Sequence, residues 1–325
     1  MQPNEMPVPV TRTAREVFGV LDASTPLQGF DKAWNTALIK TPGVKKDYVW
    51  DVQKLKVMIA FFLAGGTALK LIGQTGTGKT EYVTQFHAAL NLPLFFITAN
   101  PKMEAYHLLG REIPTQNGME WRDGPLLAAA RQGLSILIDE YNVLDPGEAT
   151  GLNAFLEGRP YTVPDTGETV VPAPGFRVFA TVNPKAFGYS GRNTQDLAND
   201  DRFVDLMFEY PEPEVEEKQV VDLLMKLRQP QTEAENIAKV VVKCANAIRS
   251  AFMGESDAQN ALPFTMSRRG VMEWAKWTLL SKSLASKGQN PLFYALDMVL
   301  GNRQDKSERL ALHSIVELGS GQTSG

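Results

Sequence analysis

The residues best suited to chemistry lie in the stretch GQTGTGKT, which covers positions 73–80. It fits the pattern G-x-x-x-x-G-K-[ST], in which glycines let backbone N–H groups face a phosphate and the following helix directs its positive dipole end at the anion. Lys79 is expected to reach the β- and γ-phosphates, and the Thr80 hydroxyl to bind Mg²⁺. A chance glycine turn is the weaker interpretation, because the motif lies between a predicted strand and a predicted helix. The residues predicted to contact the nucleotide are Gly73, Gln74, Thr75, Gly76, Thr77, Gly78, Lys79, Thr80 and Glu81.

Polar side chains follow two other predicted strands. The stretch LSILIDEYN places Asp139 and Glu140 at a strand's carboxyl end, where open α/β sheets bind ligands. Asp139 is predicted to hold Mg²⁺, directly or through water, and Glu140 to act as general base on the attacking water. In FATVNP, Asn183 is suited to orient water or the γ-phosphate. The alternatives are a solvated acidic turn for the pair and a turn-starting Asn-Pro for Asn183.

These groups need a sheet to bring them together, and the chain alternates strands with helices as such a sheet requires. Short apolar runs predict five strands, at 67–73, 92–98, 134–139, 176–183 and 204–210. Apolar residues at helical spacing predict helices at 52–64, 79 to about 91, 124–133 and 147–158. This alternation predicts a parallel α/β sheet.

Two segments interrupt the alternation with hairpin signals. Asn117-Gly118, between Ile113 and Met119, is the strongest short hairpin signal in the chain. The stretch PYTVPDTGETVVPA has β-prone residues on both sides of Gly167. We predict a hairpin at each place, with a plain surface loop as the alternative.

The chain changes character at YPEPEVEE, residues 210–217, where prolines interrupt regular structure. Beyond it all patterns are helical, at 215–227, 233–252, 267–284, 291–300 and 307–318. The first residues contain prolines and are weakly periodic, which predicts an extended arm with one short amphipathic piece. We therefore predict an arm over 1–47, an α/β nucleotide-binding domain over 48–212, an α-helical domain over 213–318 and a flexible tail over 319–325.

The composition argues against several classes of protein. The 325 residues have a formal net charge of −4 and a pI near 5.6, so no overall basic field favours nucleic acid or anionic lipid. Cys244, the only cysteine, sits among apolar residues and is predicted to be a buried structural thiol, and the histidines lack metal-ligand spacing. The N-terminus lacks the plan of a signal peptide, and the most apolar uncharged run, 57–69, is too short to span a bilayer. We expect a soluble cytoplasmic protein with no membrane contact.

Taken together, these motifs resemble an AAA+ ATPase. The likeness rests on the phosphate loop, LIDE, FATVNP, NDDRF and, in the all-helical second half, MSRRG. The two hairpins resemble the insertions of the MoxR-type group, and within it the chain is similar to the ATPase subunit of aerobic cobalt chelatase. That likeness extends to AREVFGV, DGPLLAAARQG and ILIDEYN and covers most of residues 14 to about 277. It implies a P-loop AAA+ fold with a five-stranded parallel sheet, β-hairpin insertions and an all-α lid, and with ATP and Mg²⁺ as cofactors.

The resemblance also implies roles for residues outside the phosphate loop. Asn183 matches the sensor-1 residue, Arg202 in NDDRF the arginine finger, and Arg269 in MSRRG the sensor-2 arginine of the lid. Arg192 is an alternative finger, Arg268 is an alternative sensor 2, and a local ion pair with the adjacent aspartates is the alternative role for Arg202. A finger reaches the ATP of the neighbouring subunit, where its planar cation offsets charge on the transferring phosphoryl group. The resemblance therefore implies a homo-oligomer, typically a hexameric ring.

The leading expectation is a ring-forming ATPase that uses Mg-ATP hydrolysis to remodel or activate a protein partner. The resemblance implies a partner with a von Willebrand factor A domain and includes metal insertion among the tasks, although the chain itself shows no chelatase chemistry. A nucleic-acid motor, such as a helicase or loader, is the alternative, and the acidic pI counts against it. A non-hydrolysing, nucleotide-gated scaffold is a third possibility, and Glu140 counts against that because a scaffold needs no water-activating base.

Overall fold

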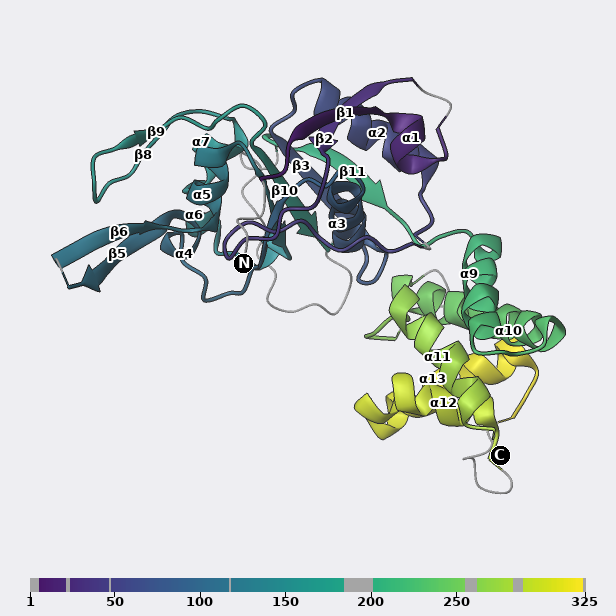
Figure 1. Cartoon of the computed structure of the whole chain (residues 1–325). Coiled ribbons are helices and arrows are strands. Elements are labelled where there is room, and N and C mark those ends of the chain that lie inside the picture. Colours follow the sequence, from purple (N-terminus) through teal and green to yellow (C-terminus); the bar gives the residue numbers. More distant parts are fainter. Residues whose placement is uncertain are drawn as a thin grey trace. The chain divides into compact units, whose positions relative to one another are not determined.

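The computed structural model describes residues 6–21, 24–46, 48–116, 118–183, 201–254, 262–282 and 289–323. The chain divides into two compact units (Figure 1). The first unit extends to Phe208 and contains the main sheet. The second begins at Glu209 and also includes the short loop Gln74–Gly78.

A five-stranded parallel sheet forms the centre of the first unit, as predicted. Its strands are β3 (Ala68–Gly73), β4 (Leu94–Thr98), β7 (Ser135–Asp139), β10 (Arg177–Val182) and β11 (Val204–Phe208). They lie in the order β11-β3-β10-β7-β4, and every neighbouring pair is parallel. Successive side chains of β7 and β10 belong to two different hydrophobic cores. Ile136 and Val178 are in one core, and Leu137 and Phe179 are in the other. Both faces of the sheet are therefore buried, which explains why these strands read as continuous apolar runs.

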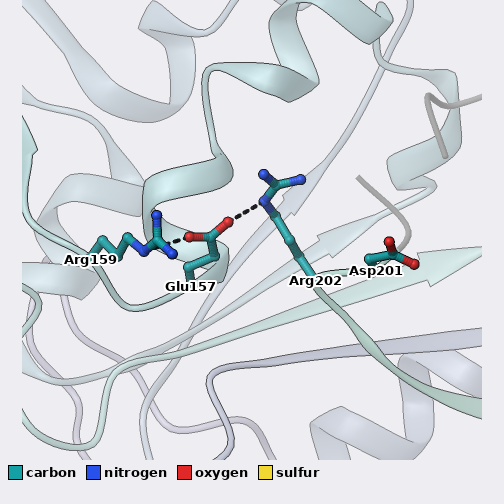
Figure 2. Close-up of a pocket in the computed structure, with 4 residues that line it drawn as sticks. All are labelled: Glu157, Arg159, Asp201 and Arg202. Carbon is teal, nitrogen blue, oxygen red and sulfur yellow. Dashed lines mark hydrogen bonds and ion pairs between the residues drawn. The ribbon is translucent and has the colours of Figure 1, made fainter. Parts of the chain in front are cut away.

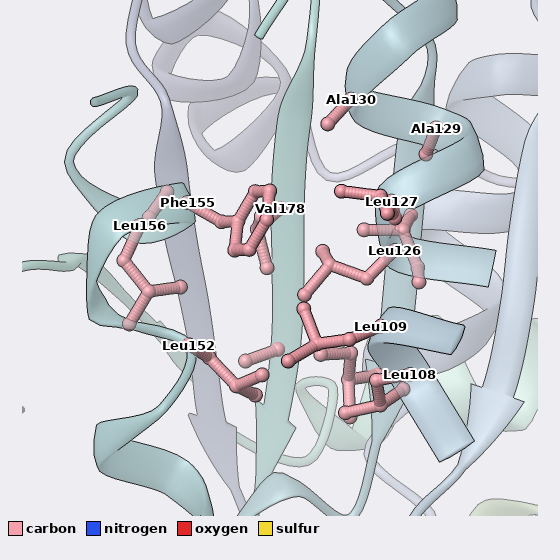
Figure 3. Packing of buried hydrophobic residues seen from close by; sticks show 14 of the residues in the cluster. Leu108, Leu109, Leu126, Leu127, Ala129, Ala130, Leu152, Phe155, Leu156 and Val178 are labelled. Carbon is pink, nitrogen blue, oxygen red and sulfur yellow. The ribbon is translucent and has the colours of Figure 1, made fainter. Parts of the chain in front are cut away.

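The described helices that follow the N-terminal segment in the first unit lie against the two faces of this sheet. They are α2 (Val52–Leu63), α3 (Lys79–Ala89), α4 (Tyr106–Leu109), α5 (Pro125–Gln132), α6 (Pro146–Thr150) and α7 (Asn153–Leu156), with a 3₁₀ turn η1 (Tyr141–Val143). Leu126 of α5 and Phe155 of α7 pack beside Val178 of β10 (Figure 3). The single helix predicted over 147–158 is interrupted at Gly151, where the low helix propensity of glycine favours the observed division into α6 and α7.

Both predicted hairpins are present. β5 (Gly110–Thr115) pairs antiparallel with β6 (Gly118–Asp123), between α4 and α5. β8 (Tyr161–Thr162) pairs antiparallel with β9 (Thr169–Val170), directly before β10. Figure 1 shows the two hairpins projecting on the same side of the first unit.

The N-terminal segment contains more structure than the predicted arm. β1 (Pro9–Thr13) pairs antiparallel with β2 (Pro26–Phe30), and α1 (Ala14–Phe18) lies between them. Thr13 and Glu16 form a capping box that fixes the start of α1. Phe18 and Leu27 are buried in the core that also contains residues of α2 and α3. The segment therefore packs as part of the first unit.

The second unit is helical after residue 209, as predicted. Its helices are α9 (Pro213–Lys226), α10 (Gln231–Met253), α11 (Arg268–Leu280), α12 (Pro291–Val299) and α13 (Lys306–Ser320), with a 3₁₀ turn η3 (Gly301–Arg303). Trp274 is fully buried in their common core. Arg249 and Glu216 form a buried ion pair with Nη1–Oε2 at 2.7 Å. In the parts of the chain that the structure describes, no helix is long and apolar enough to cross a membrane.

Candidate nucleotide-binding site

The loop between β3 and α3 has a backbone that requires glycine at several positions, Gly73 and Gly78 among them. At Gly73, a Cβ atom would lie 2.1 Å from the carbonyl oxygen of Phe208 on the neighbouring strand. Gly78 has φ +98°, a left-handed conformation that L side chains rarely adopt. The side chain of Thr77 donates to the carbonyl oxygen of Gln74 at 2.9 Å, which tightens the turn. The glycines of the motif therefore allow the backbone conformation that a phosphate-binding loop requires.

Lys79 is the first residue of α3 and is buried, with 6% of its surface exposed. Its Nζ donates to the carbonyl oxygen of Gly73 at 2.6 Å and to Oδ1 of Asn183 at 2.8 Å. The carbonyl oxygen of Asn183 in turn accepts from Nδ2 of Asn142 at 3.0 Å. The structure thus brings Lys79 and Asn183 into direct contact, although 104 positions separate them in the chain.

Thr80 and Asp139 also meet across the sheet edge. The Thr80 hydroxyl donates to Oδ1 of Asp139 at 2.6 Å. Thr80 is in the first turn of α3, and Asp139 is the last residue of β7. A hydroxyl and a carboxylate at this distance are a ligand pair suited to a hard cation. The neighbouring Glu81 forms an ion pair with Lys45, Nζ–Oε2 2.6 Å.

Glu140 has a strained backbone. Its φ of 58° and ψ of 38° place a side-chain-bearing residue in the left-handed region at the start of η1. Its backbone N–H donates to the Thr181 hydroxyl at 2.9 Å, and that hydroxyl donates to Oδ1 of Asp139 at 2.6 Å. Such strain persists where surrounding contacts hold it and is frequent at functional sites.

Sequence reasoning missed Thr181 and Asn142, although both contact predicted site residues. Thr181 belongs to the FATVNP stretch that was used only for Asn183. Its role depends on β10 lying next to β7, with Ala180 opposite Ile138, so that Thr181 adjoins Asp139. This adjacency of strands cannot be read from local sequence pattern. Only the position of a hydroxyl near a strand end could have pointed to it.

Arg202 lies in the first unit, just before β11, against Glu157 after α7. Its Nε contacts Oε1 of Glu157 at 2.5 Å, and Nε of Arg159 contacts the other oxygen, Oε2, at 2.6 Å. Figure 2 shows the Glu157 carboxylate between the two guanidinium groups, with Asp201 on the same rim. These four residues line a pocket of about 610 Å³. The alternative finger, Arg192, lies outside the described residues.

The candidate sensor-2 arginines are the first two residues of α11 in the second unit. The Arg269 side chain is exposed, whereas Arg268 is partly buried and its Nη2 donates to Oε1 of Gln219 at 2.6 Å. The backbone N–H of Arg268 donates to the carbonyl oxygen of Gly76 at 3.4 Å, in the loop that belongs to the same unit. Arg268 therefore lies against this loop, and Arg269 is open to solvent.

The chemistry of these groups suits a nucleotide with Mg²⁺. The buried ammonium of Lys79 and the glycine-shaped loop are suited to phosphate oxygens. The described residues contain no group of three or more His, Cys, Asp or Glu able to hold a metal. Mg²⁺ does not need such a cage, because it usually takes one or two carboxylates together with phosphates and water. Thr80 and Asp139 fit that requirement.

Comparison with known proteins agrees with this geometry. Residues 68–203 match the family described as the AAA domain of the dynein-related subfamily. These residues are an AAA domain. The AAA domain includes the phosphate loop, Asp139, Glu140, Asn183 and Arg202, so the predicted motifs fall within one matched segment.

Relatives of the AAA domain confirm the MoxR-type resemblance. NirQ of Stutzerimonas stutzeri, a denitrification regulatory protein, is 32% identical over 157 residues, covering 48% of this chain and 56% of that protein. NorQ of Paracoccus denitrificans is 34% identical over 145 residues, covering 44% and 53%. The aerobic cobaltochelatase subunit CobS of a Sinorhizobium species is 28% identical over 278 residues, covering 82% of this chain and 80% of that protein. The chain thus spans about half the length of NirQ and of NorQ, and 80% of the length of CobS.

Proposed function

We propose that this chain is a Mg-ATP-hydrolysing AAA+ ATPase that works as a ring and remodels or activates a protein partner. The proposal of ATP hydrolysis rests on one observation: side chains at the ends of three strands contact one another. Lys79, after β3, contacts Asn183, after β10, and Thr80 contacts Asp139 at the end of β7. A phosphate-binding lysine, a hydroxyl–carboxylate pair and the adjoining Glu140 are thereby collected at one edge of the sheet, where α/β proteins bind ligands.

Each residue has a distinct proposed task. The loop N–H groups and Lys79 bind the phosphates, and Thr80 with Asp139 would hold Mg²⁺. When bound, the ion would neutralise negative charge on the phosphate oxygens. Glu140 takes the proton of the attacking water as general base. Asn183 holds Lys79 through its side chain and orients the water or the γ-phosphate.

Two arginines are proposed to complete the site. Arg202 is the finger that reaches the nucleotide of a neighbouring subunit in a hexameric ring, and the pocket that it shares with Glu157, Arg159 and Asp201 supports its presentation on a surface. For sensor 2, Arg269 is the residue that the family motif selects. The contact between Arg268 and the loop carbonyl of Gly76 supports Arg268 as the competing candidate.

The proposed output is mechanical work on another protein. The names of NirQ, a regulatory protein, and CobS, a cobaltochelatase subunit, support a role in activating a second protein, with metal insertion as one form of that work. A partner with a von Willebrand factor A domain belongs to the same proposal. The two hairpins on one side of the first unit are suitable elements for contacting it (Figure 1).

The deciding experiment compares phosphate release from ATP by the wild-type chain and by Glu140→Gln. We expect Mg²⁺-dependent turnover in the wild type and a loss of about 10²–10⁴-fold in the variant, because the general base is gone. ATP binding should persist, and the ring measured by light scattering should be stabilised by the unhydrolysed nucleotide. Glu120→Gln, the same change on the exposed β5–β6 hairpin, is the control. Near-normal turnover in Glu140→Gln would reject the assigned base.

The same assay discriminates the nucleic-acid alternative. If single-stranded DNA stimulates turnover and the stimulation falls steeply with salt, the chain is a nucleic-acid motor instead. The net charge of −4 leads us to expect no such stimulation.

A further inference from the structure

Thr181 lies near the end of β10 and is almost fully buried, with 2% of its surface exposed. Its hydroxyl makes two hydrogen bonds to consecutive residues of the neighbouring strand end. It donates to Oδ1 of Asp139 at 2.6 Å and accepts from the backbone N–H of Glu140 at 2.9 Å. A single oxygen atom therefore joins the proposed magnesium ligand to the proposed base.

Only a small hydroxyl side chain can make this connection. A hydroxyl donates one hydrogen bond and accepts others at the same time, which neither an alkyl nor an ammonium group can do. Valine has nearly the shape of threonine but would leave the Glu140 N–H without this acceptor and Asp139 without this donor. Burial makes both losses expensive, because water does not readily replace the missing partner.

The bond to Glu140 acts on a strained part of the backbone. Glu140 has φ 58° and ψ 38°, and its N–H belongs to the peptide that enters this conformation. A left-handed conformation at a residue with a side chain persists only when surrounding contacts determine it. The Thr181 hydroxyl is one such contact. It therefore helps to fix the backbone conformation of Glu140 at the end of β7.

The bond to Asp139 is independent of the phosphate loop. Oδ1 of Asp139 also accepts from Thr80, at 2.6 Å. Thr80 is itself a proposed Mg²⁺ ligand, so its hydroxyl has another task when the ion is present. Thr181 comes from β10 and supplies a second donor that does not share this task.

We propose that Thr181 is a positioning residue for ATP hydrolysis: it sets the orientation of the Asp139 carboxylate and of the Glu140 backbone together. This role rests on the proposed function of the same site. It assigns to the strand β10 a second functional side chain, two positions before Asn183.

Kinetics of Thr181→Val and Thr181→Ser test the proposal. In Thr181→Val we expect kcat to fall by about ten- to a hundredfold, while KM for ATP stays within about twofold, because the lost hydrogen bonds orient residues rather than bind phosphate. Thr181→Ser keeps the hydroxyl and should recover most of kcat. The matched control is Thr98→Val, an exposed threonine directly opposite Asp139 on β4, which should leave kcat unchanged.

A second measurement needs neither nucleotide nor turnover. Amide hydrogen exchange at Glu140 in the nucleotide-free protein should be faster in Thr181→Val than in the wild type, and close to wild type in Thr181→Ser and Thr98→Val. The melting temperature of each variant shows whether it is folded. If Thr181→Val fails to fold, Thr181→Ser decides: it must then keep most of the wild-type kcat and an exchange rate at Glu140 close to that of the wild type.

The outcomes separate this inference from the function on which it rests. Wild-type kcat and exchange in a folded Thr181→Val protein, with turnover lost in Glu140→Gln, would overturn the role of Thr181 alone. A loss of kcat that Thr181→Ser does not recover would also overturn it, because the hydroxyl would not be the cause. Normal turnover in both Thr181→Val and Glu140→Gln would overturn the proposed base itself.

Discussion

Arg131 of α5 holds Glu168 with both terminal guanidinium nitrogens, Nη1–Oε1 at 2.5 Å and Nη2–Oε2 at 2.7 Å. Its Nε also donates to Oδ2 of Asp123, at 2.7 Å. Glu168 lies between β8 and β9, and Asp123 is the last residue of β6. One side chain of α5 thus connects the two inserted hairpins.

Arg131→Gln should loosen both hairpins while leaving the sheet intact. The change removes the charged, bidentate contact to Glu168 and weakens the contact to Asp123. We expect several-fold faster amide hydrogen exchange in residues 161–170, with a smaller change in 118–123. Arg122→Gln, an exposed arginine on the same hairpin, is the matched control and should leave exchange unchanged. Equal protection in the wild type and Arg131→Gln would mean that the contact does not restrain the hairpins.

The Arg131–Glu168 contact should also weaken in acid. Hydrogen bonding from Arg131, and to a lesser degree its charge, holds the pKa of Glu168 below its usual value. A carboxylate with a lowered pKa contributes stability that is fully present above its ordinary pKa of about 4.3 and is lost as the pH falls through the lowered pKa. Hydrogen exchange of residues 161–170 measured from pH 6 to 3 should therefore approach that of Glu168→Gln at the acid end, after correction for the intrinsic pH dependence of exchange. A constant difference between the two proteins across this range would contradict the assignment.

Lys79→Ala should weaken ATP binding strongly. The substitution removes the buried ammonium that contacts Gly73 and Asn183 and is proposed to bind phosphate. Hydrogen bonds to a charged group contribute about 1.5–3 kcal/mol each, so the Kd for ATP should rise by at least about tenfold. Isothermal titration with ATP measures this, and Lys32→Ala, an exposed lysine, should retain the wild-type Kd. Unchanged affinity in Lys79→Ala would reject the phosphate-loop interpretation.

Arg202→Ala should abolish turnover in a pure ring and recover part of it in mixed rings. Loss of an arginine finger lowers kcat by about 10³-fold or more. When Arg202→Ala and Lys79→Ala subunits are mixed in equal amounts, about one interface in four combines an intact loop with an intact finger. Phosphate release from the mixture measures this recovery. Arg159→Ala, which removes the other guanidinium on Glu157, is the control and should not require complementation. Absence of recovery at every mixing ratio would argue against action in trans.

His87 should make the folded state sensitive to acid. Its pKa is lowered to about 4, mainly by burial, with a smaller contribution from the nearby Arg177 charge, while the Nδ1–H bond to the Val83 carbonyl opposes the shift. Because the unfolded chain binds the proton more readily, stability falls as the pH drops from about 6.5 to 4, by about 3 kcal/mol for this group. Denaturant unfolding of the wild type and His87→Phe at several pH values measures the difference in slope. Identical slopes would show that His87 does not stay neutral in the folded chain.

Much of the fold follows from local sequence signals. Buried strands such as β7 and β10 appear as short apolar runs because both of their faces are covered. The β5–β6 and β8–β9 hairpins follow from turn residues at Asn117-Gly118 and Gly167. Residues whose proposed roles depend on type and spacing within one motif, such as Lys79 and Thr80, can be named from the sequence for the same reason.

Features that depend on long-range pairing could not be predicted in this way. The β1–β2 pair joins two short segments, each beginning with a proline, whose local pattern resembles an extended arm. The contacts of Thr181 with Asp139 and of Arg202 with Glu157 require knowledge of which strands and helices are neighbours. Local patterns carry no information about the strand order, so these partners become visible only in the folded chain.

Six residues, 171–176, join the β8–β9 hairpin to β10, and this short covalent link has a mechanical consequence. β10 spans six residues, Arg177–Val182, which corresponds to a length of about 20 Å. It is bonded on both sides, by β3 and β7, and such a strand resists bending. If a partner protein binds the hairpin, as proposed, a load on it would pass through residues 171–176 before it reached β10, Thr181 and Asn183. Strand β10 thus provides a covalent connection between the hairpin proposed to contact a partner and the site proposed to hydrolyse ATP.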